Sequence, residues 1–388
     1  MNVILISPHF PKANQYFAKS LKEQGVNVLG LGQEPYEQLP DQLKESLTEY
    51  FRVENLEDLE EAKRAVAFLI FKHGPIDRLE SFSEYWLEFD AQLREQFNIP
   101  GLKSNQLTKT KHKSAMKKVF KKAGVPVVEG RLVKSVTGLT NALRQLGFPV
   151  VLKPDVGVGA QETFKISNHE ELETFQAQWD DQVPYFVEPY IENGQLCTFD
   201  GLVDANGTIV FQTSFYYTSP ALELLRDKLD YATVVEKEID PKLADYGKAI
   251  VKEMGMKERF FHIEFFRLPN HDYIALEYNN RPAGGYILDL YNYAYSCDLY
   301  TIYAQMLTGK LPETLNLHQE YGVGIARRNH INYQHHLDDI RQKYQTACKL
   351  IEQIPDLFAP SMGDIFIAIT ASTPAEVEEI ISYVMESV

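Results

Sequence analysis

The sequence predicts a fold that combines α/β and α+β architecture in more than one domain. Residues 1–105 alternate apolar runs with helical spacing, a pattern typical of a parallel sheet covered by helices. From Gln195 the chain becomes rich in strands with hairpin signals, which predicts an antiparallel sheet. Strand and helix patterns are mixed again from about His318, and 388 residues exceed the usual size of one domain.

The N-terminal unit opens as strand, helix and strand. Residues 2–7 (NVILIS) predict a buried strand, and the helical segment after it ends at Gly25, a C-cap signal. A second strand (VNVLGLG) and a long amphipathic helix (LEDLEEAKRAVAFLIFKHG) follow, and turn formers close the unit near residues 98–105. GxGxxG is absent, so the unit lacks a dinucleotide-binding fingerprint.

The middle and the end of the chain divide into shorter elements. A basic helix runs through residues 109–122, and three strands follow at VPVVEGRLV, FPVVLKP and YFVEPYI. Further strands are predicted at LCTFDGLVD, GTIVFQTSFYY, RFFHIEFFRL and YIALEYN. One long helix is expected in YILDLYNYAYSCDLYTIYAQMLTG and another around HHLDDIRQKYQTACKLIEQI, before the strand DIFIAIT and a last helix.

Composition and charge exclude several classes of protein. The net charge of −15, from 39 basic and 54 acidic residues, argues against non-specific nucleic-acid binding, which requires Lys and Arg to neutralise phosphates. No apolar run approaches the roughly 18 residues that span a bilayer. The chain opens on a strand rather than a signal peptide, and its three cysteines are widely spaced, so we expect a cytoplasmic protein without disulfides.

The stretch ALEYNNRPAGGY places three polar side chains on one face of a strand. Glu277, Asn279 and Arg281 stand at every second position, and alternate residues of a strand point to the same side. Aligning this strand with RFFHIEFFRL through the loop PNHD places Glu264 opposite Glu277 and His262 opposite Asn279. The same alignment makes Leu268 face Tyr273.

Two opposed carboxylates in aromatic surroundings are unfavourable unless a cation separates them. Directly opposed side chains have Cβ atoms roughly 4.5–5.5 Å apart, where like charges destabilise a sheet. Glu264, Glu277 and Asn279 offer only oxygen ligands, which suit a hard cation such as Mg²⁺ completed by substrate phosphates. The alternative is an exposed sheet face with coincidental acids, and a satisfied sheet histidine is the better interpretation of His262.

Cations that could meet a phosphate occur elsewhere in the chain. Lys153 ends the apolar strand FPVVLKP, and DVGVG after it offers small turns whose N–H groups can approach phosphate oxygens. Each signal alone is weak, because a lysine at a strand end commonly extends into water. Lys113 begins the basic helix and cannot be distinguished from its neighbours by spacing.

Taken in this order, the motifs resemble those of the ATP-grasp superfamily, in the branch of carboxylate–amine ligases and biotin-carboxylase-like enzymes. The pair HIEFF and ALEYNNRPAGG is the most specific element, and the resemblance covers essentially the whole chain. It implies a parallel-sheet pre-ATP-grasp domain (1–105), a mobile lid half (106–187), an antiparallel catalytic half (188–312) and a small C-terminal α+β domain (313–388).

The resemblance also implies roles for individual residues. The implied metal ligands are Glu264, Glu277 and Asn279, and Arg281 is the implied catalytic residue. The implied ATP-binding residues are Lys113, Lys153, Gly157, Gly159, Glu188, Tyr190 and Ile191, and the implied substrate-binding residues are Gly284 and Gly285. The implied cofactors are ATP and Mg²⁺, or Mn²⁺ in its place. Leu196 stands where many relatives have an acid that touches ribose or metal, which leaves the ribose contact open.

The function implied is an ATP-dependent carboxylate–amine ligase, which activates a carboxylate as an acyl phosphate, releases ADP and joins the acyl group to an amine. Small amino-acid-type molecules are the implied substrates, and homodimers are frequent in the superfamily. One alternative is a biotin-carboxylase-like enzyme that uses bicarbonate, although Gly284-Gly285 favours amino-acid ligases and no AMKM biotin-attachment motif occurs. The other alternative is a nucleotide-binding module without catalysis, against which the complete set of Glu264, Glu277, Asn279 and Arg281 argues.

Overall fold

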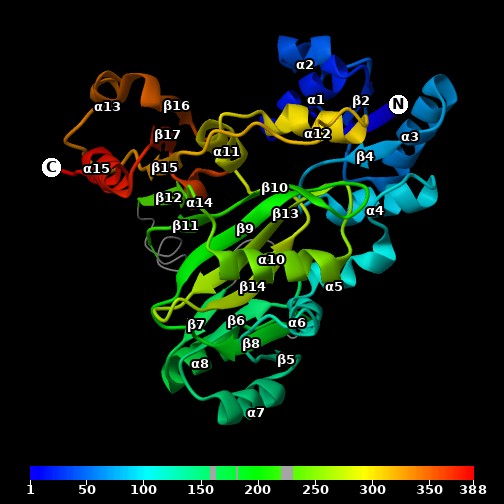
Figure 1. The fold of residues 1–388 in the computed structure, drawn as a ribbon. Helices are drawn as coiled ribbons and strands as arrows, with labels where there is room; N and C mark the ends of the chain where they lie inside the picture. The colour runs from blue at the N-terminus through cyan, green and yellow to red at the C-terminus, as the bar shows by residue number, and fades with distance from the viewer. Residues whose placement is uncertain (158–162, 181, 220–229) are drawn as a thin grey trace.

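The computed structural model describes residues 1–157, 163–180, 182–219 and 230–388, which form three sheets with helices packed against them (Figure 1). The first sheet is parallel throughout, in the strand order β3-β2-β1-β4, as the strand–helix–strand pattern predicts. Its elements are β1 (Asn2–Ile6), α1 (Ala13–Glu23), β2 (Asn27–Gly32), α2 (Asp41–Ser46), β3 (Glu49–Arg52), α3 (Leu59–His73), β4 (Arg78–Glu80) and α4 (Leu87–Gln96).

The second sheet is small and antiparallel, and it lies at the opposite end of the molecule from α1 and α2 (Figure 1). Its strand order is β5-β8-β6-β7. The helices at residues 136–146 and 169–178 cover a core that includes Val150, Leu152 and Val187. The elements are α5 (Thr108–Lys111), α6 (Lys113–Lys122), β5 (Arg131–Val133), α7 (Val136–Leu146), β6 (Val150–Pro154), β7 (Phe164–Ile166), α8 (His169–Gln178) and β8 (Tyr185–Pro189).

The third sheet has nine strands, in the order β14-β13-β9-β11-β12-β15-β17-β16 with β10 paired to β9. The C-terminal strands therefore continue the predicted catalytic sheet instead of forming a sheet of their own. The strands are β9 (Gln195–Val203), β10 (Ile209–Thr213), β11 (Phe215–Tyr217), β12 (Tyr231–Val235), β13 (Arg259–Arg267), β14 (Tyr273–Asn279), β15 (Tyr321–Arg327), β16 (Cys348–Gln353) and β17 (Ile365–Ala371). The helices are α10 (Pro241–Met254), α11 (Ile287–Tyr295), α12 (Leu299–Leu307), α13 (Leu337–Tyr344), α14 (Ala359–Met362) and α15 (Pro374–Met385).

The pairing of β13 with β14 confirms the predicted register at the acids and corrects it near the loop. Glu264 faces Glu277 and His262 faces Asn279, as predicted. Beyond Glu264 the register shifts by one residue, so Arg267 rather than Leu268 faces Tyr273. The Leu268 N–H donates to the carbonyl of Asp272 at 2.8 Å and closes the loop earlier, and Leu276 is the extra residue of a β-bulge.

Two of the predicted long helices are wrong in detail. The first is divided into α11 and α12, because Ser296 is left-handed at φ 49° and Asp298 caps a new helix by accepting from the N–H groups of Tyr300 and Thr301. The second ends at Tyr344, and residues 348–353 form β16, which pairs with β17.

The carboxylate of Asp289 joins α11 to α12 through a hydrogen bond with Tyr300, and it leads to a prediction about stability. Burial raises the pKa of Asp289 to about 6, although the Tyr300 hydroxyl donates to it at 2.8 Å and opposes that rise. The folded-state pKa exceeds the ordinary value of 3.8. The contribution of this carboxyl group to the free energy of unfolding therefore falls as the pH rises from about 4 to about 6. Asp289→Asn should remove that fall, worth at most about 3 kcal/mol.

The measurement for Asp289→Asn is the free energy of unfolding in urea at pH 5 and pH 8, relative to the unsubstituted protein. We expect the difference between the two proteins to favour the variant more strongly at pH 8. Parallel pH profiles would contradict a raised pKa at this position.

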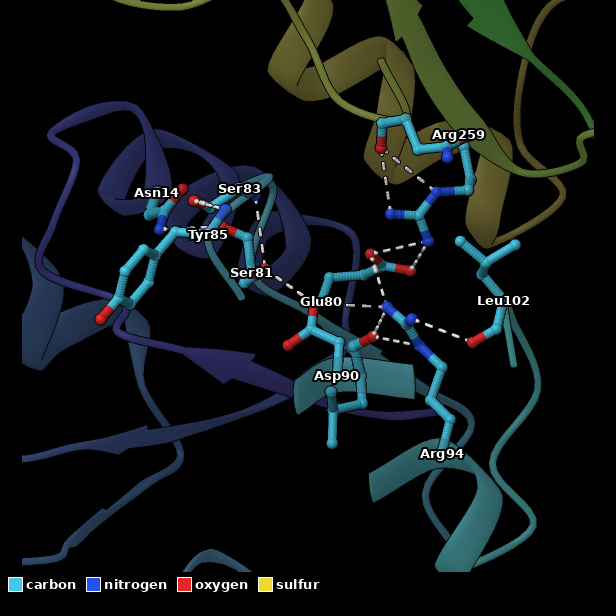
Figure 2. Close-up of polar contacts among 11 residues, drawn as sticks. Asn14, Glu80, Ser81, Ser83, Tyr85, Asp90, Arg94, Leu102 and Arg259 are labelled. Atoms are coloured by element: carbon cyan, nitrogen blue, oxygen red, sulfur yellow. Dashed lines mark hydrogen bonds and ion pairs between the residues drawn. The ribbon is translucent and has the colours of Figure 1, made fainter. Parts of the chain in front are cut away.

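A cluster of buried charges joins the parallel sheet to the nine-stranded sheet (Figure 2). Glu80, at the end of β4, contacts the guanidinium groups of Arg94 at 3.0 Å and Arg259 at 3.2 Å. Arg259 lies on β13 and donates to the carbonyl of Asn280 at 3.2 Å. Arg94 is 0% exposed and also lies 3.6 Å from Asp90. The cluster therefore fixes the backbone that immediately precedes Arg281.

One edge of the nine-stranded sheet is partly covered by the segment that leads to β5. Residues 125–130 were expected to belong to that strand, but β5 begins only at Arg131. Val127 instead forms an isolated parallel bridge with Ala275 of β14, whose N–H donates to the carbonyl of Pro126 at 2.9 Å. The segment thus links the small sheet to the strand that carries Glu277.

Two further expectations can be compared with the described residues. No helix in the described ranges is both long and apolar enough to cross a membrane. Cys197, Cys297 and Cys348 are all unpaired, as predicted.

Candidate active site

A cavity of about 390 Å³ lies where the small sheet, the β13–β14 hairpin and the C-terminal residues 361–366 meet. It brings together residues that the sequence analysis selected from distant parts of the chain: Lys113, Lys153, Glu188, Tyr190, Ile191, Glu264, Glu277, Asn279, Arg281 and Gly284. Leu196 lines the same cavity. Gly159 lies outside the described residues, so its predicted role stays a prediction.

The opposed carboxylates have different electrostatic surroundings. Burial would raise the pKa of Glu264, but the hydrogen bond and charge of His262, with Nε2 3.4 Å from Oε1, lower it. Burial raises the pKa of Glu277, an effect that Lys113, with Nζ at 3.9 Å, opposes and Glu264 reinforces. Glu277 is therefore the carboxylate of the pair whose charge is less well compensated, and a bound cation would favour its charged form.

The described residues fit a magnesium ion held by few protein ligands. Among them there is no group of three or more His, Cys, Asp and Glu side chains arranged for a metal. Glu264, Glu277 and Asn279 line one cavity and provide two carboxylates and an amide. Such a set suits Mg²⁺, which commonly retains water and takes substrate phosphate oxygens as its remaining ligands.

A buried lysine that was not predicted, Lys117, contacts one of the acids that line the cavity. Glu188 accepts from Lys153 at 2.8 Å and lies 3.0 Å from Lys117, which is 5% exposed. Although burial would raise the pKa of Glu188, the two ammonium groups lower it to about 2. Glu188 therefore holds the two lysines in place, and its role in ATP binding stays a prediction.

The backbone near Glu188 retains part of the predicted contact. The Tyr190 N–H donates to the carbonyl of Pro149 at 3.0 Å, which leaves the Tyr190 carbonyl and the Ile191 amide for a ligand. Gly157 lies outside the cavity lining, and its carbonyl accepts from Lys113 at 3.5 Å.

Arg281 lines the cavity, and its charge acts on a buried acid that sequence reasoning missed. Its Nη1 donates to the carbonyl of Pro282 at 2.9 Å. Burial raises the pKa of Glu84, which is 8% exposed, and the charge of Arg281 opposes that rise. One oxygen of Glu84, Oε2, is buried without a hydrogen-bond partner among the described residues.

His262 is satisfied within the sheet, as predicted, and it also lines the cavity. Its Nδ1 lies 2.7 Å from Asp200, which also accepts from the hydroxyl of Tyr291. Burial would lower the pKa of His262, but the charges and hydrogen bonds of Asp200 and Glu264 raise it to about 9. The alternating polar positions Thr198 and Asp200 in LCTFDGLVD were the signal available in the sequence for this network.

Gly284 and Gly285 differ in their relation to the cavity. Gly284 lines it, with space for a Cβ whose nearest neighbour would be Arg281 Nη1 at 3.9 Å. Gly285 has φ +64°, and a Cβ there would lie 2.1 Å from Met362 Cε, so only glycine allows this close approach.

Comparison with known proteins agrees with this geometry. Residues 146–289 match the family model of the ATP-grasp domain. The L-arginine-specific L-amino acid ligase of Bacillus subtilis is 23% identical over 299 residues, which cover 74% of this chain and 70% of that enzyme. The crystal structure of L-amino acid ligase from Bacillus licheniformis is 15% identical, with a TM-score of 0.74 over 98% of this chain and 97% of that one.

A carboxylase shares the fold as well. The biotin carboxylase domain of Hydrogenobacter thermophilus 2-oxoglutarate carboxylase, solved with MgADP and bicarbonate, is 17% identical, with a TM-score of 0.72 over 100% of this chain and 90% of that one. At these identities the solved structures establish the fold, and the family model establishes the domain within it. Residues 146–289 therefore form an ATP-grasp domain, and the whole chain has the fold that L-amino acid ligases and biotin carboxylases share.

Proposed function

We propose that the protein is an ATP-dependent ligase that activates a carboxylate as an acyl phosphate, with release of ADP, and joins it to an amine. The observation that carries the proposal is the presence of two lysines, two opposed carboxylates, Asn279 and Arg281 in one cavity. The family match and the likeness to L-amino acid ligases support it. Amino-acid-type molecules are the proposed substrates.

The cavity residues have different roles in phosphoryl transfer. This reaction requires positioning and charge neutralisation more than covalent chemistry by the protein. Lys113 and Lys153 neutralise the phosphate oxygens of ATP, and Glu188 together with Lys117 keeps Lys153 in position. Glu264, Glu277 and Asn279 would hold Mg²⁺, which when bound would supply positive charge to the phosphate oxygens. Gly157, Gly159 and the backbone of Tyr190 and Ile191 remain the proposed nucleotide contacts.

The second half of the reaction takes place near Arg281. Its guanidinium stabilises the phosphoryl group during transfer and then the oxyanion that forms when the amine attacks the acyl phosphate. The departing phosphate accepts the proton that the amine loses. The C–N bond forms as the C–O bond to phosphate breaks, and inorganic phosphate leaves.

Product analysis tests this proposal. The purified protein is incubated with Mg·ATP and pools of amino acids, and nucleotides are separated by chromatography. ADP and phosphate that appear only with an amino-acid pool would support the ligase. AMP and pyrophosphate would exclude an acyl phosphate, and no turnover despite ATP binding would favour a nucleotide-binding module.

A second candidate is a carboxylase-like reaction with bicarbonate. The observation in its favour is the shared fold with a biotin carboxylase domain solved with MgADP and bicarbonate. ADP release stimulated by bicarbonate alone, without an amino acid, would select this candidate over the ligase.

The proposed metal ligands make a prediction about magnesium. Glu277→Ala should weaken Mg·ATP binding by ~10-fold or more, because loss of one of two carboxylates lowers the negative charge of the metal set. Isothermal titration of ATP at several Mg²⁺ concentrations measures this effect. Glu253→Ala, which removes an acid on α10 outside the cavity lining, is the matched control and should bind as the unsubstituted protein does. An unchanged Mg²⁺ requirement in Glu277→Ala would remove Glu277 from the metal set.

A further inference from the structure

Beyond Arg281 the cavity continues into an end lined by aromatic and apolar side chains. This apolar end is formed by Tyr217, Tyr231, Tyr286, Ile287, Met362 and Phe366. None of these six side chains carries a charge. The titratable and cationic residues among the described lining are Lys113, Lys153, Glu188, His262, Glu264, Glu277 and Arg281.

The walls of the apolar end are held by contacts between different elements. The rings of Tyr286 and Phe366 stack with centroids 5.3 Å apart, and those of Tyr217 and Tyr231 lie 6.0 Å apart. The Tyr231 hydroxyl donates to the carbonyl of Met362 at 3.4 Å. Strand β12, the loop before α11 and the end of α14 therefore form one packed wall.

The apolar end begins at the reacting groups themselves. Burial raises the pKa of the Tyr217 hydroxyl well above its usual value, and the charges of Glu264 and Arg281 act on it in opposite directions. Tyr217 lines the same cavity as Glu264 and Arg281, and a Cβ at Gly284 would lie 3.9 Å from Arg281 Nη1. A substrate whose carboxylate or amine lies at Arg281 would direct its side chain along these rings.

At the apolar end, the Met362 side chain lies against the backbone of Gly285. Its Cε would lie 2.1 Å from a Cβ at position 285, so its side chain rests on Gly285. Met362 is only partly buried, and an unbranched thioether adapts to the shape beside it. Its length therefore sets how far a substrate side chain can extend.

We propose that the apolar end selects an amino acid with an uncharged apolar side chain as a substrate, and that Met362 sets its size; this rests on the ligase function proposed above. A charged side chain would lose its water against these six residues, none of which offers it an opposite charge, and this loss is costly. An apolar side chain would instead bury its surface against the rings. The L-arginine-specific relative from Bacillus subtilis would then differ from this chain in substrate.

The test is ADP release with single amino acids at equal concentrations, comparing leucine, methionine and phenylalanine with lysine, arginine, glutamate and aspartate. We expect kcat/KM for the best apolar amino acid to exceed that of every charged one by ~10-fold or more, as binding in an apolar pocket commonly discriminates. Turnover preferred with a charged amino acid would overturn the inference and leave the ligase function intact. Preference for lysine or arginine would identify the tyrosines as a cation–π site. ADP release with no amino acid would overturn both.

Two variants of nearly equal size test whether Met362 itself contacts the substrate side chain. Met362→Glu should lower kcat/KM for the preferred apolar amino acid and raise it for lysine or arginine, relative to Met362→Gln, because only the first adds a charge. Met362 is partly exposed, so both variants should fold. Equal profiles for the two variants would show that Met362 does not contact the substrate side chain.

Discussion

Arg281→Ala is expected to lower kcat for ADP release by ~10²–10³ and to leave ATP binding largely unchanged. The guanidinium contacts no described acid as an ion pair and donates only to the carbonyl of Pro282, so its charge is available to the substrate. Because the charge develops in the transition state, its loss affects turnover more than ground-state binding. Steady-state ADP release with the amino-acid pool and calorimetric titration of ATP measure the two effects.

Arg281→Lys is the matched control for this prediction. It retains the charge but loses the planar fork that can contact two oxygens at once, so we expect an intermediate kcat. Wild-type turnover in Arg281→Ala would refute the catalytic role. If Arg281→Ala also lost ATP binding, the result would indicate that Arg281 binds the nucleotide.

Arg94→Ala is expected to have the largest effect on stability, a loss of ~3–5 kcal/mol in the free energy of unfolding. The substitution leaves Glu80 and Asp90 buried beside a cavity, with Arg259 as the remaining cation of the cluster (Figure 2). Unfolding in urea, followed by circular dichroism, measures the change.

An exposed arginine provides the control for Arg94. Arg52 pairs with Glu54 at 3.4 Å, and both side chains are largely exposed, so Arg52→Ala should change stability by ~1 kcal/mol or less. If both variants unfold at the same urea concentration, the buried cluster does not stabilise the fold as its geometry indicates.

The sequence predicted the elements whose signals are local. Apolar strands, helix caps and the strand–helix–strand opening led correctly to the parallel sheet, and the hairpin alignment correctly opposed Glu264 and Glu277. The shift at Leu276 was missed, because loop closure at Leu268 decides where the ladder begins. Residues 348–353 have helical apolar spacing, but pairing with β17 overrides that preference.

The site was predictable where its residues share a hairpin and less so where it depends on tertiary contacts. Lys117 is indistinguishable from the other lysines of its helix in sequence, and only the approach of Glu188 selects it. Glu84 comes from the parallel-sheet domain, far from Arg281 in sequence, so no spacing connects the two. The ion pairs of Glu188 with Lys117 and Lys153 were likewise not predictable, because the three residues become neighbours only after folding.

The bridge between Val127 and Ala275 has a consequence for self-association. Strand β14 lies at an edge of the nine-stranded sheet, and an uncovered edge strand is a template for pairing with another molecule. The Pro126 carbonyl accepts a hydrogen bond from the Ala275 N–H, and Val127 bridges Ala275. This segment therefore blocks pairing at that point of β14, the strand that carries Glu277 and Asn279. Changes that detach this segment would therefore promote aggregation through the same strand that builds the site, so solubility and activity would decline together.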